Sequence, residues 1–351
     1  MIVCLYGKTC AAFVEPVVYD LRAAAATLNA EVVGVTIERA LAERARDRTK
    51  WVGVRRAYVL PFDVPASRPL DAPSAPSELL RWLFPGAEVL NAFDVHAICW
   101  DKPTLAERWL HRSVRVPDGI LTNSVDEAAA FVQQHEHAIL KAPHSCGGHD
   151  HYVVTAAADG LVAEARGQAY ELELVAAGAR AHIHDRQLRY PGPFYLQKLV
   201  ADKGARGVLR PAQLLRAYIV DGQLVCWTER YRPRVRRSSD WIISSGTGGK
   251  YRFVFSVNEE AHKLALRAAE VIGLRVGVVD VARTSNDGAY VLSAYTDGHH
   301  MMIDREFKRL PEFRDHFDFD RYIAEALVAE PTPVAPPPTN TESESNNRRR
   351  R

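Results

Sequence analysis

The sequence predicts an α/β protein in which a parallel, Rossmann-like N-terminal unit precedes a larger unit of hairpins and helices. Two observations support this fold class. About the first 90 residues alternate apolar, strand-like runs with helical stretches, an order that favours a parallel sheet. Further along, two apolar runs are joined by Asp221-Gly222, which is typical of a tight hairpin because both central residues need positive φ.

The N-terminal unit begins with a strand over Met1–Tyr6, an apolar run that ends at a polar turn. An alanine-rich helix over 14–28 and a second strand over 31–36 should follow. Residues 65–76 are rich in proline, serine and alanine and predict a surface loop. A short helix over 77–83 should close this unit.

Two helix starts match the capping box, in which a hydroxyl caps the third amide and a glutamate reaches back to the first. Thr104 with Glu107 forms one match, and Ser124 with Glu127 forms the other. We therefore expect Thr104 and Ser124 to be N-cap residues.

The larger unit should be built mainly of antiparallel strands, because its apolar runs are separated by turn residues. A glycine- and histidine-rich turn at 145–151 should join the first two strands as a hairpin. A helix over 258–272 should end at Gly273. The expected strands are 138–142, 152–155, 194–200, 214–220, 223–229, 276–282 and 289–295, with a last helix over 322–328.

Composition narrows the function classes. Hydrophobic residues make up 47% and charged residues 25% of the 351, as in ordinary globular proteins, and a net charge of +2 gives no strong field for nucleic acid or membranes. The five scattered cysteines form no CxxC pair, and the N-terminus lacks the basic region of a signal peptide, so we expect a cytoplasmic protein. Gly7-Lys8-Thr9 lacks the earlier glycine of a P-loop.

Residues from Pro331 to Arg351 combine proline, polar residues and a final run of arginines. Such a segment buries too little apolar surface to offset the entropy of ordering, so we expect a disordered tail.

Several short pieces occur in an order that resembles one enzyme family. They are Asp101-Lys102 before a helix, Lys141 on a strand, Gln197-Lys198-Leu199 on another, Arg216 and Glu229-Arg230 on a hairpin, and Asp280 facing the strand 291–295. Together they resemble the ATP-grasp superfamily, with RimK-type and glutathione-synthetase-like carboxylate–amine ligases as the nearest pattern. The resemblance covers about residues 89–304.

The resemblance implies an organisation in three parts. Residues 1–88 would form a preATP-grasp domain, and residues 89–330 an ATP-grasp domain. Its two subdomains, at about 103–193 and 194–330, would hold the nucleotide between them. The tail would occupy 331–351.

The resemblance also implies an ATP site. Lys102 and Lys141 would neutralise phosphates as point charges, and an unpaired lysine inside the apolar run around Lys141 would be costly to bury. Adenine would meet the strand that carries Gln197, Lys198 and Leu199, although the family often has an acidic residue where Lys198 stands. Surface lysines and an ordinary core strand are the plainer alternatives. The remaining implied nucleotide contacts are Ser145, Gly147 and Gly148, in a mobile loop over the phosphates, and Asp202 at the ribose.

Arg216 and Arg230 are the expected catalytic residues, because the Asp221-Gly222 hairpin could bring them side by side. Two guanidinium groups on one sheet face suit a transferring phosphoryl group and an oxyanion. The family usually has Asp two residues before the first arginine, where this chain has Leu214. Ion pairs at the surface are the alternative for both arginines.

The expected Mg²⁺ site departs from the family pattern. Asp280 matches the first ligand, but Ser293 and Tyr295 stand where catalytic members have glutamate and asparagine. Asp297 lies two residues further and is the candidate replacement ligand. This departure puts metal binding, and hence phosphoryl transfer, in question.

Three functions remain open. The first is an ATP- and Mg²⁺-dependent ligase that joins small-molecule or peptide carboxylates and amines through an acyl phosphate. The second is a degenerate ATP-grasp protein that binds nucleotide or a partner as a scaffold. The third, a basic RNA- or protein-binding module around residues 230–237, is the least favoured, and no membrane partner is expected. The oligomeric state stays open, although the resemblance makes a homodimer reasonable.

Overall fold

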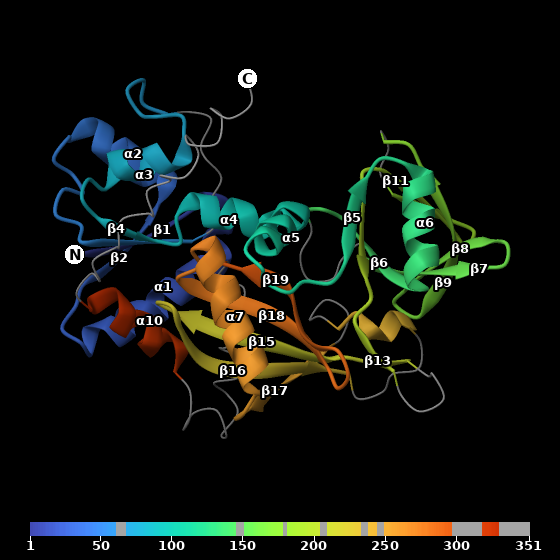
Figure 1. Cartoon of the computed structure of the whole chain (residues 1–351). Coiled ribbons are helices and arrows are strands. Elements are labelled where there is room, and N and C mark those ends of the chain that lie inside the picture. The colour runs from blue at the N-terminus through green and yellow to red at the C-terminus, as the bar shows by residue number, and fades with distance from the viewer. Residues whose placement is uncertain are drawn as a thin grey trace, which may run out of the picture.

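The computed structural model describes residues 1–60, 68–144, 151–177, 181–203, 209–232, 238–243, 249–296 and 318–329. Within these ranges the strands form one parallel sheet, two larger sheets and a small β-ribbon (Figure 1). None of the described helices is long and apolar enough to cross a membrane. Among the described residues, Cys4, Cys10, Cys99 and Cys226 form no disulfide bond.

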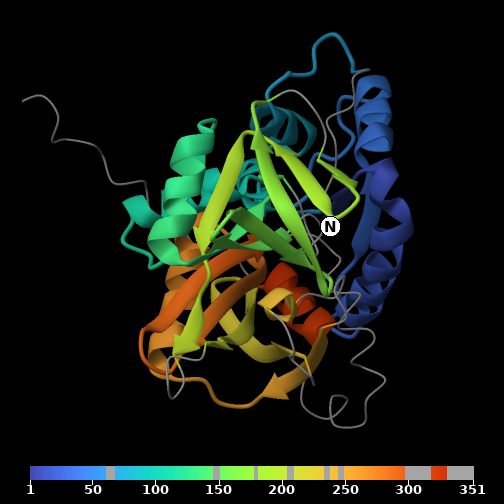
Figure 2. The same cartoon turned by 90° about the vertical axis from the view of Figure 1, so that its right-hand side faces the viewer.

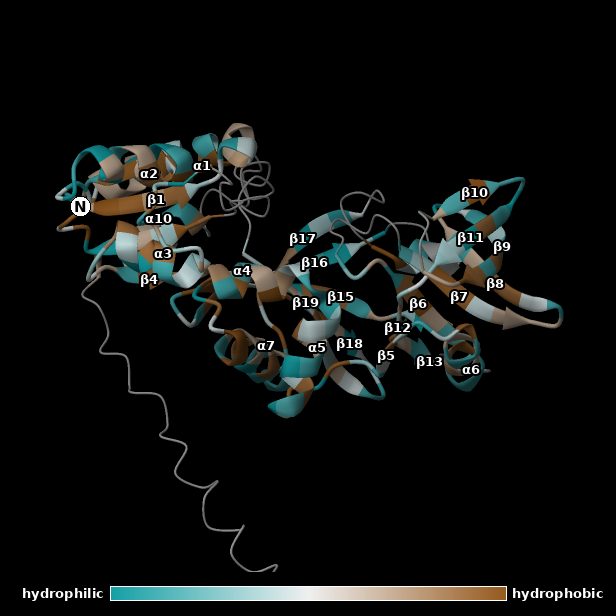
Figure 3. Cartoon of the chain, turned by 90° about the horizontal axis from the view of Figure 1, so that it is seen from above, coloured by the Kyte–Doolittle hydropathy of each residue, from teal (hydrophilic) through white to brown (hydrophobic). Residues whose placement is uncertain are grey.

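The N-terminal sheet is parallel, as the sequence predicts, with strand order β2-β1-β3-β4. Its central strand β1 is wholly buried and is brown in the hydropathy view (Figure 3). The strands are β1 (Ile2–Tyr6), β2 (Val32–Thr36), β3 (Arg56–Val59) and β4 (Glu88–Leu90); a short turn η1 (Lys8–Cys10) precedes the helices α1 (Ala11–Ala26), α2 (Ile37–Arg46) and α3 (Pro76–Leu83).

The eight-stranded sheet faces the viewer in Figure 2 and has the order β10-β11-β9-β8-β7-β6-β12-β5. β12 pairs with both β5 and β6, so residues 194–198 belong to this sheet although they follow the expected subdomain boundary at 194. The strands are β5 (Gly119–Thr122), β6 (His137–Lys141), β7 (His151–Ala157), β8 (Gly160–Ala165), β9 (Gln168–Val175), β10 (His182–His184), β11 (Gln187–Pro191) and β12 (Phe194–Lys198).

Helix α6 (Val125–His135) covers this sheet through Ala128 and Val132. Ser124 is its N-cap, as predicted, and accepts a hydrogen bond from the amide of Glu127 at 3.2 Å. The second half of the predicted box is wrong. The Glu127 carboxylate accepts a bond from Thr122 Oγ1, and Thr122 in turn accepts from the Ser124 amide.

The predicted start of helix α5 (Lys102–His111) is also wrong, by three residues. Asp101 is the N-cap and accepts bonds from the amide and the hydroxyl of Thr104 at 3.2 and 2.8 Å. A carboxylate is as good a cap as a hydroxyl, and proline is favoured at the first helical turn. Pro103 therefore lies inside the helix, and Lys102 is its first residue.

The central sheet is antiparallel with the order β17-β16-β15-β18-β19. The predicted hairpin joins β15 to β16, and its two turn residues have φ of 50° and 77°. The elements are β15 (Gln213–Val220), β16 (Gln223–Tyr231), β17 (Lys250–Val254), β18 (Val276–Thr284), β19 (Gly288–Tyr295) and helix α7 (Glu259–Ile272), with the ribbon β13 (Ala201–Lys203) and β14 (Leu209–Pro211) and the short η3 (Ser238–Trp241) nearby.

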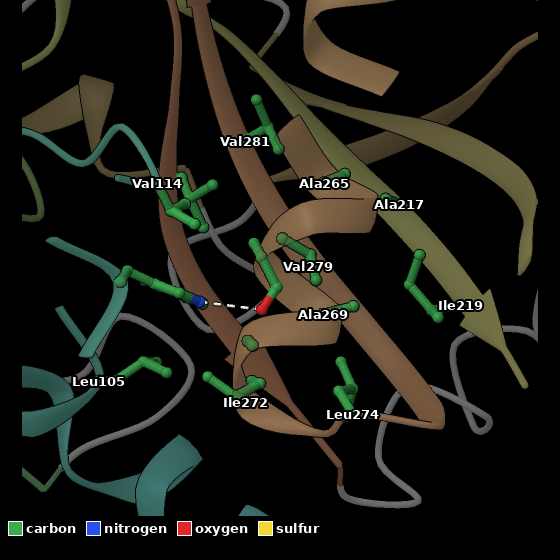
Figure 4. Close-up of a cluster of buried hydrophobic side chains, with 14 of the residues drawn as sticks. Leu105, Val114, Ala217, Ile219, Ala265, Ala269, Ile272, Leu274, Val279 and Val281 are labelled. Atoms are coloured by element: carbon green, nitrogen blue, oxygen red, sulfur yellow. Dashed lines mark hydrogen bonds between the residues drawn. The ribbon is translucent and has the colours of Figure 1, made fainter. Parts of the chain in front are cut away.

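One face of the central sheet packs on α7 and α5 (Figure 4). Small alanines of α7 let the helix approach the valines and isoleucines of β15 and β18, and Trp109 Nε1 donates a hydrogen bond to the Ala268 carbonyl at 3.0 Å. Such dry, close-packed contacts are the main source of stability. Asn258 caps α7, and Gly273 ends it with φ of 72°.

The opposite face of the central sheet packs on helix α10 (Phe319–Val328), which also contacts α1 of the N-terminal unit. The Phe319 and Tyr218 rings meet edge to face with centroids 5.3 Å apart. Asn91, just before α4 (Phe93–Trp100), accepts bonds from the amides of Arg275 and Val276. The N-terminal sheet and the central sheet thus share one apolar core.

Candidate active site

Two groups of buried polar side chains coincide with the residues expected from the sequence. The arginine cluster consists of Arg216, Arg230 and Asp280 on the central sheet. The lysine cluster consists of Lys102, Lys141 and Gln197 at the eight-stranded sheet and the start of α5. All six are buried.

The arginine cluster follows from strand register. Arg216 of β15 lies opposite Asp280 of β18 on one side and Thr228 of β16 on the other. Alternate residues of a strand share a face, so Arg230 lies on this face too. Arg216 donates hydrogen bonds to the Asp280 carboxylate from Nε at 2.7 Å and from Nη2 at 3.0 Å. Arg230 Nη2 forms an ion pair with the same carboxylate at 2.8 Å.

Burial and charge act in opposite directions within this cluster. Burial alone would raise the pKa of Asp280, but the nearby charges of Arg216 and Arg230 outweigh it and lower that pKa below its ordinary value. Burial likewise disfavours the charge of Arg216, and Asp280 restores it, raising the pKa of the guanidinium. The cluster is therefore ionised, with two positive charges sharing one negative charge.

The neighbouring strand β19 adds no carboxylate to this cluster. Ser293 lies opposite Asp280 and donates its hydroxyl to Oδ2 at 3.1 Å. The Tyr295 ring lies 5.6 Å from the Arg216 guanidinium carbon, within range of a cation–π contact. Burial, with a smaller contribution from Asp280, raises the pKa of the Tyr295 phenol, so this residue stays neutral.

These residues do not fit the Mg²⁺ site expected around Asp280. Mg²⁺ requires octahedral oxygen ligands, usually including one or two carboxylates. Both Asp280 oxygens already accept hydrogen bonds from arginine. Throughout the described ranges, no three His, Cys, Asp or Glu side chains are grouped so as to hold a metal. Asp297, the other expected ligand, lies outside those ranges.

Two donors in the arginine cluster are buried without a partner. The Nε of Arg230 and the hydroxyl of Thr228 are both buried and make no hydrogen bond in the described part of the chain. The two residues are next but one on β16 and so face the same way. Unsatisfied buried donors are rare and costly, and they often indicate a bound group.

The lysine cluster is held by hydrogen bonds to neutral oxygen atoms. Lys141 Nζ donates to Gln197 Oε1 at 2.5 Å, from the last residue of β6 to the next strand β12. Burial, followed by repulsion from Lys102, lowers the pKa of Lys141 from 10.5 to about 7. This lysine can therefore gain or lose its charge near neutral pH.

Lys102 enters the lysine cluster through the start of α5. Its amide donates to the Pro143 carbonyl at 3.2 Å, which ties the helix to the segment that follows β6. Its Nζ lies 3.4 Å from the Ala142 carbonyl oxygen. Lys102 is thus near enough to Lys141 to repel its charge, and Lys141 bonds to Gln197.

The strand expected to meet adenine is anchored through its backbone. The Lys198 amide donates to the Asp118 carbonyl at 2.8 Å, and the Leu199 amide to the His137 carbonyl at 3.2 Å. The Leu199 side chain is buried in a small apolar cluster with Val153 and Ile242. These two amides are therefore already engaged, so any adenine contact by this strand would use its carbonyls or side chains.

Asp202 of β13 links the small β-ribbon to the central sheet. Its carboxylate accepts bonds from the amide and the hydroxyl of Ser285, at 2.5 and 2.8 Å, in the turn between β18 and β19. The carboxylate expected at the ribose is thus engaged with the central sheet. Ser145, Gly147 and Gly148, the expected phosphate loop, lie outside the described residues.

No family model matches the chain. Among curated proteins, the tetrahydromethanopterin:α-L-glutamate ligase of Methanocaldococcus jannaschii is 27% identical over 176 residues, which is 50% of this chain and 50% of that protein. The match thus spans about half the length of this relative. It indicates a distant relationship to a ligase.

Solved structures match over nearly the whole chain. The ATP-grasp ligase PsnB, complexed with a minimal precursor, Mg and ADP, matches with a TM-score of 0.56 and 16% identity, over 93% of this chain and 96% of its own. A RimK-domain ATP-grasp protein from Sphaerobacter thermophilus matches with a TM-score of 0.53 and 14% identity, over 94% and 100%. At these identities the likeness concerns the fold alone, and the chain has the fold of these ATP-grasp proteins.

Proposed function

We propose that this chain is an ATP-dependent ligase that joins a carboxylate to an amine. The observation that supports this most directly is the pair of buried arginines, Arg216 and Arg230, on one face of the central sheet of an ATP-grasp fold. Burying two guanidinium groups around one carboxylate is expensive, and a phosphoryl group is the kind of ligand that two guanidiniums bind.

In the proposed reaction, a substrate carboxylate oxygen attacks the γ-phosphorus of ATP. The bond from that phosphorus to the bridging oxygen breaks, ADP leaves and an acyl phosphate remains. An amine nitrogen then attacks the acyl carbon, phosphate leaves with the bonding pair, and the nitrogen loses a proton. Arg216 and Arg230 would stabilise the negative charge on the transferring phosphoryl group and on the tetrahedral oxyanion.

The lysine cluster would hold the other phosphates. Lys141, with a pKa of about 7, would take up a proton as the phosphates approach, because a nearby negative charge favours the charged form. Lys102 would add a second positive charge. Residues 145–148 would cover the phosphates, and the β12 strand at Gln197, Lys198 and Leu199, with Asp202, would lie beside the nucleoside.

The names of the relatives suggest substrate classes to test. One relative is an α-L-glutamate ligase, and one structure of PsnB is a complex with a precursor peptide and AMPPNP. We therefore propose an amino acid such as L-glutamate as the amine, and a small-molecule or peptide carboxylate as the acceptor of the phosphoryl group.

The test traps the acyl phosphate with hydroxylamine. The full chain is incubated with ATP, magnesium and panels of amino acids and acidic peptides, and hydroxamate and ADP are measured together. We expect equal amounts of both with at least one carboxylate. Arg230→Met should reduce the rate at least tenfold, whereas Arg252→Met should not, because Arg252 is an exposed arginine on the neighbouring strand β17, paired with Glu229. ADP release without hydroxamate across a broad panel would count against ligation.

A second candidate function is nucleotide binding without turnover. Ser293 favours it, because a neutral hydroxyl contacts Asp280 from the strand position where catalytic members carry a carboxylate. Thermal denaturation with and without ATP separates the candidates. Stabilisation by ATP with neither ADP nor hydroxamate formed would indicate a scaffold or regulatory module.

A further inference from the structure

The Asp280 carboxylate is surrounded by donors. Oδ1 accepts a hydrogen bond from Arg216 Nε, Oδ2 accepts from Arg216 Nη2 and Ser293 Oγ, and Arg230 Nη2 forms an ion pair with Oδ2, at distances between 2.7 and 3.1 Å. A carboxylate offers about four lone-pair positions. A metal ion would therefore have to compete with these four donor groups for Asp280.

The charge around Asp280 also opposes a divalent cation. Two guanidinium groups and one carboxylate sum to a net charge of +1 in this cluster. The β19 residues that face it, Ser293 and Tyr295, are neutral, and the described part of the chain groups no three metal-ligating side chains anywhere. A site of this kind attracts an anion and repels Mg²⁺.

The buried donors of β16 that lack an acceptor indicate where an anion would bind. Arg230 uses Nη2 on Asp280, while its Nε is buried without a partner, and so is the Thr228 hydroxyl on the same face. Phosphate oxygens are strong acceptors, and Arg recognises them with its planar fork. A phosphate drawn to this face would gain bonds that the protein on its own leaves unmade.

We infer that the nucleotide phosphates bind this chain directly through Arg216 and Arg230, without a metal ion held by the protein. Asp280 is then a positioning residue: it holds the two guanidinium groups side by side on the central sheet. Permanent arginine charges take the place of the divalent ion that the fold implies. This inference rests on the nucleotide binding in the proposed function and holds for both the ligase and the non-catalytic module.

Calorimetric titration of the full chain with ADP and with ATP tests the inference, once with excess EDTA and once with saturating Mg²⁺. We expect the two dissociation constants to agree within about threefold. Arg230→Met should weaken metal-free binding at least tenfold, and Arg252→Met, an exposed control on β17, should leave it unchanged. If Arg230→Met binds metal-free nucleotide as tightly as the parent chain, the guanidinium is not a phosphate ligand and the inference fails.

A second variant tests whether the lack of a second carboxylate beside Asp280 is the reason that the cluster binds no metal ion. Ser293→Glu places a carboxylate beside Asp280, and Gln223→Glu adds the same charge at the exposed start of β16 as a control. We expect only Ser293→Glu to weaken metal-free binding, at least tenfold, and to make Mg²⁺ restore it. Because Ser293 is buried, circular dichroism must first establish that this variant folds; if it does not, the titrations of the parent chain decide alone.

The possible outcomes separate the two proposals. Binding that requires Mg²⁺, with affinity lost a hundredfold or more in EDTA, would overturn the metal-free site and leave the proposed function standing. No binding of ADP or ATP under either condition would overturn both. Equal binding in EDTA and Mg²⁺ supports the inference whether or not the chain turns ATP over.

Discussion

The lysine cluster and the arginine cluster bury positive charge in different ways. Lys141 bonds to the neutral amide oxygen of Gln197 and faces Lys102, and its pKa falls to about 7. Arg216 and Arg230 share the Asp280 carboxylate, and the pKa of Arg216 rises. The lysine cluster can lose positive charge near neutral pH, whereas the arginine cluster stays ionised.

This difference separates two uses of a buried cation. The charge of a lysine such as Lys141 depends on pH and on its ligand. A bound phosphate favours the charged form and so restores the proton. An arginine held by a carboxylate is positioned in advance and needs no proton transfer. Three predictions test whether the two clusters differ in this way, beginning with the largest expected effect.

Asp280→Asn should destabilise the fold by about 3–5 kcal/mol, because it leaves two buried guanidinium groups without a charged partner. Urea denaturation followed by circular dichroism measures this loss. Asp287→Asn, in the exposed turn before β19, is the control and should change stability by no more than about 0.5 kcal/mol. A loss below about 1 kcal/mol for Asp280→Asn would contradict the buried ion pairs.

Lys141→Met should flatten the pH dependence of stability. Between pH 7 and 10.5 the unfolded chain keeps the Lys141 proton and the folded chain releases it, so the unfolded state binds more protons and stability rises with pH. The rise approaches about 1.4 kcal/mol per pH unit within this window. Below pH 7 both states hold the proton, and the full cost of burying the charge remains.

Urea midpoints at pH 7, 8 and 9 test this prediction for the parent chain and the Lys141→Met variant. Lys263→Met, which removes an exposed lysine paired with Glu259, serves as the control and should keep the parental slope. Identical slopes for the parent chain and Lys141→Met would mean that Lys141 stays charged throughout, like the arginines.

Ser293→Ala should cost about 1 kcal/mol, the usual net value of one hydrogen bond, because Asp280 keeps its two hydrogen bonds from Arg216 and its ion pair with Arg230. A double-mutant cycle with Asp280→Asn measures the coupling between the two residues. We expect a coupling of about 0.5 kcal/mol or more. Strict additivity would mean that the hydroxyl does not support the carboxylate.

Most of the fold could be predicted from local signals. The Asp221-Gly222 turn, the Ser124 cap and Gly273 after α7 each specify one backbone conformation, and the structure has all three. The start of α5 was missed because Asp101 competes with Thr104 as a cap. β9 was not assigned, although Glu171 and Glu173 alternate in it with the buried Leu172 and Leu174.

The candidate site was only partly predictable, because its contacts depend on pairing between distant strands. Arg216 and Asp280 are 64 residues apart and meet only through the register of β15 on β18. Asp280 was expected as a metal ligand, yet in the structure its nearest partners are the two arginines. The contact of Asp202 with Ser285 likewise joins two sheets, and no local pattern announces it.

Helix α10 has a consequence for how the molecule can move. It seals the N-terminal sheet and the central sheet into a single platform, and Asn91 ties the two sheets together. Sliding these two sheets apart would expose that apolar interior to water, and this cost opposes their separation. A chain cut before Phe319 would expose the platform's apolar surface and tend to self-associate.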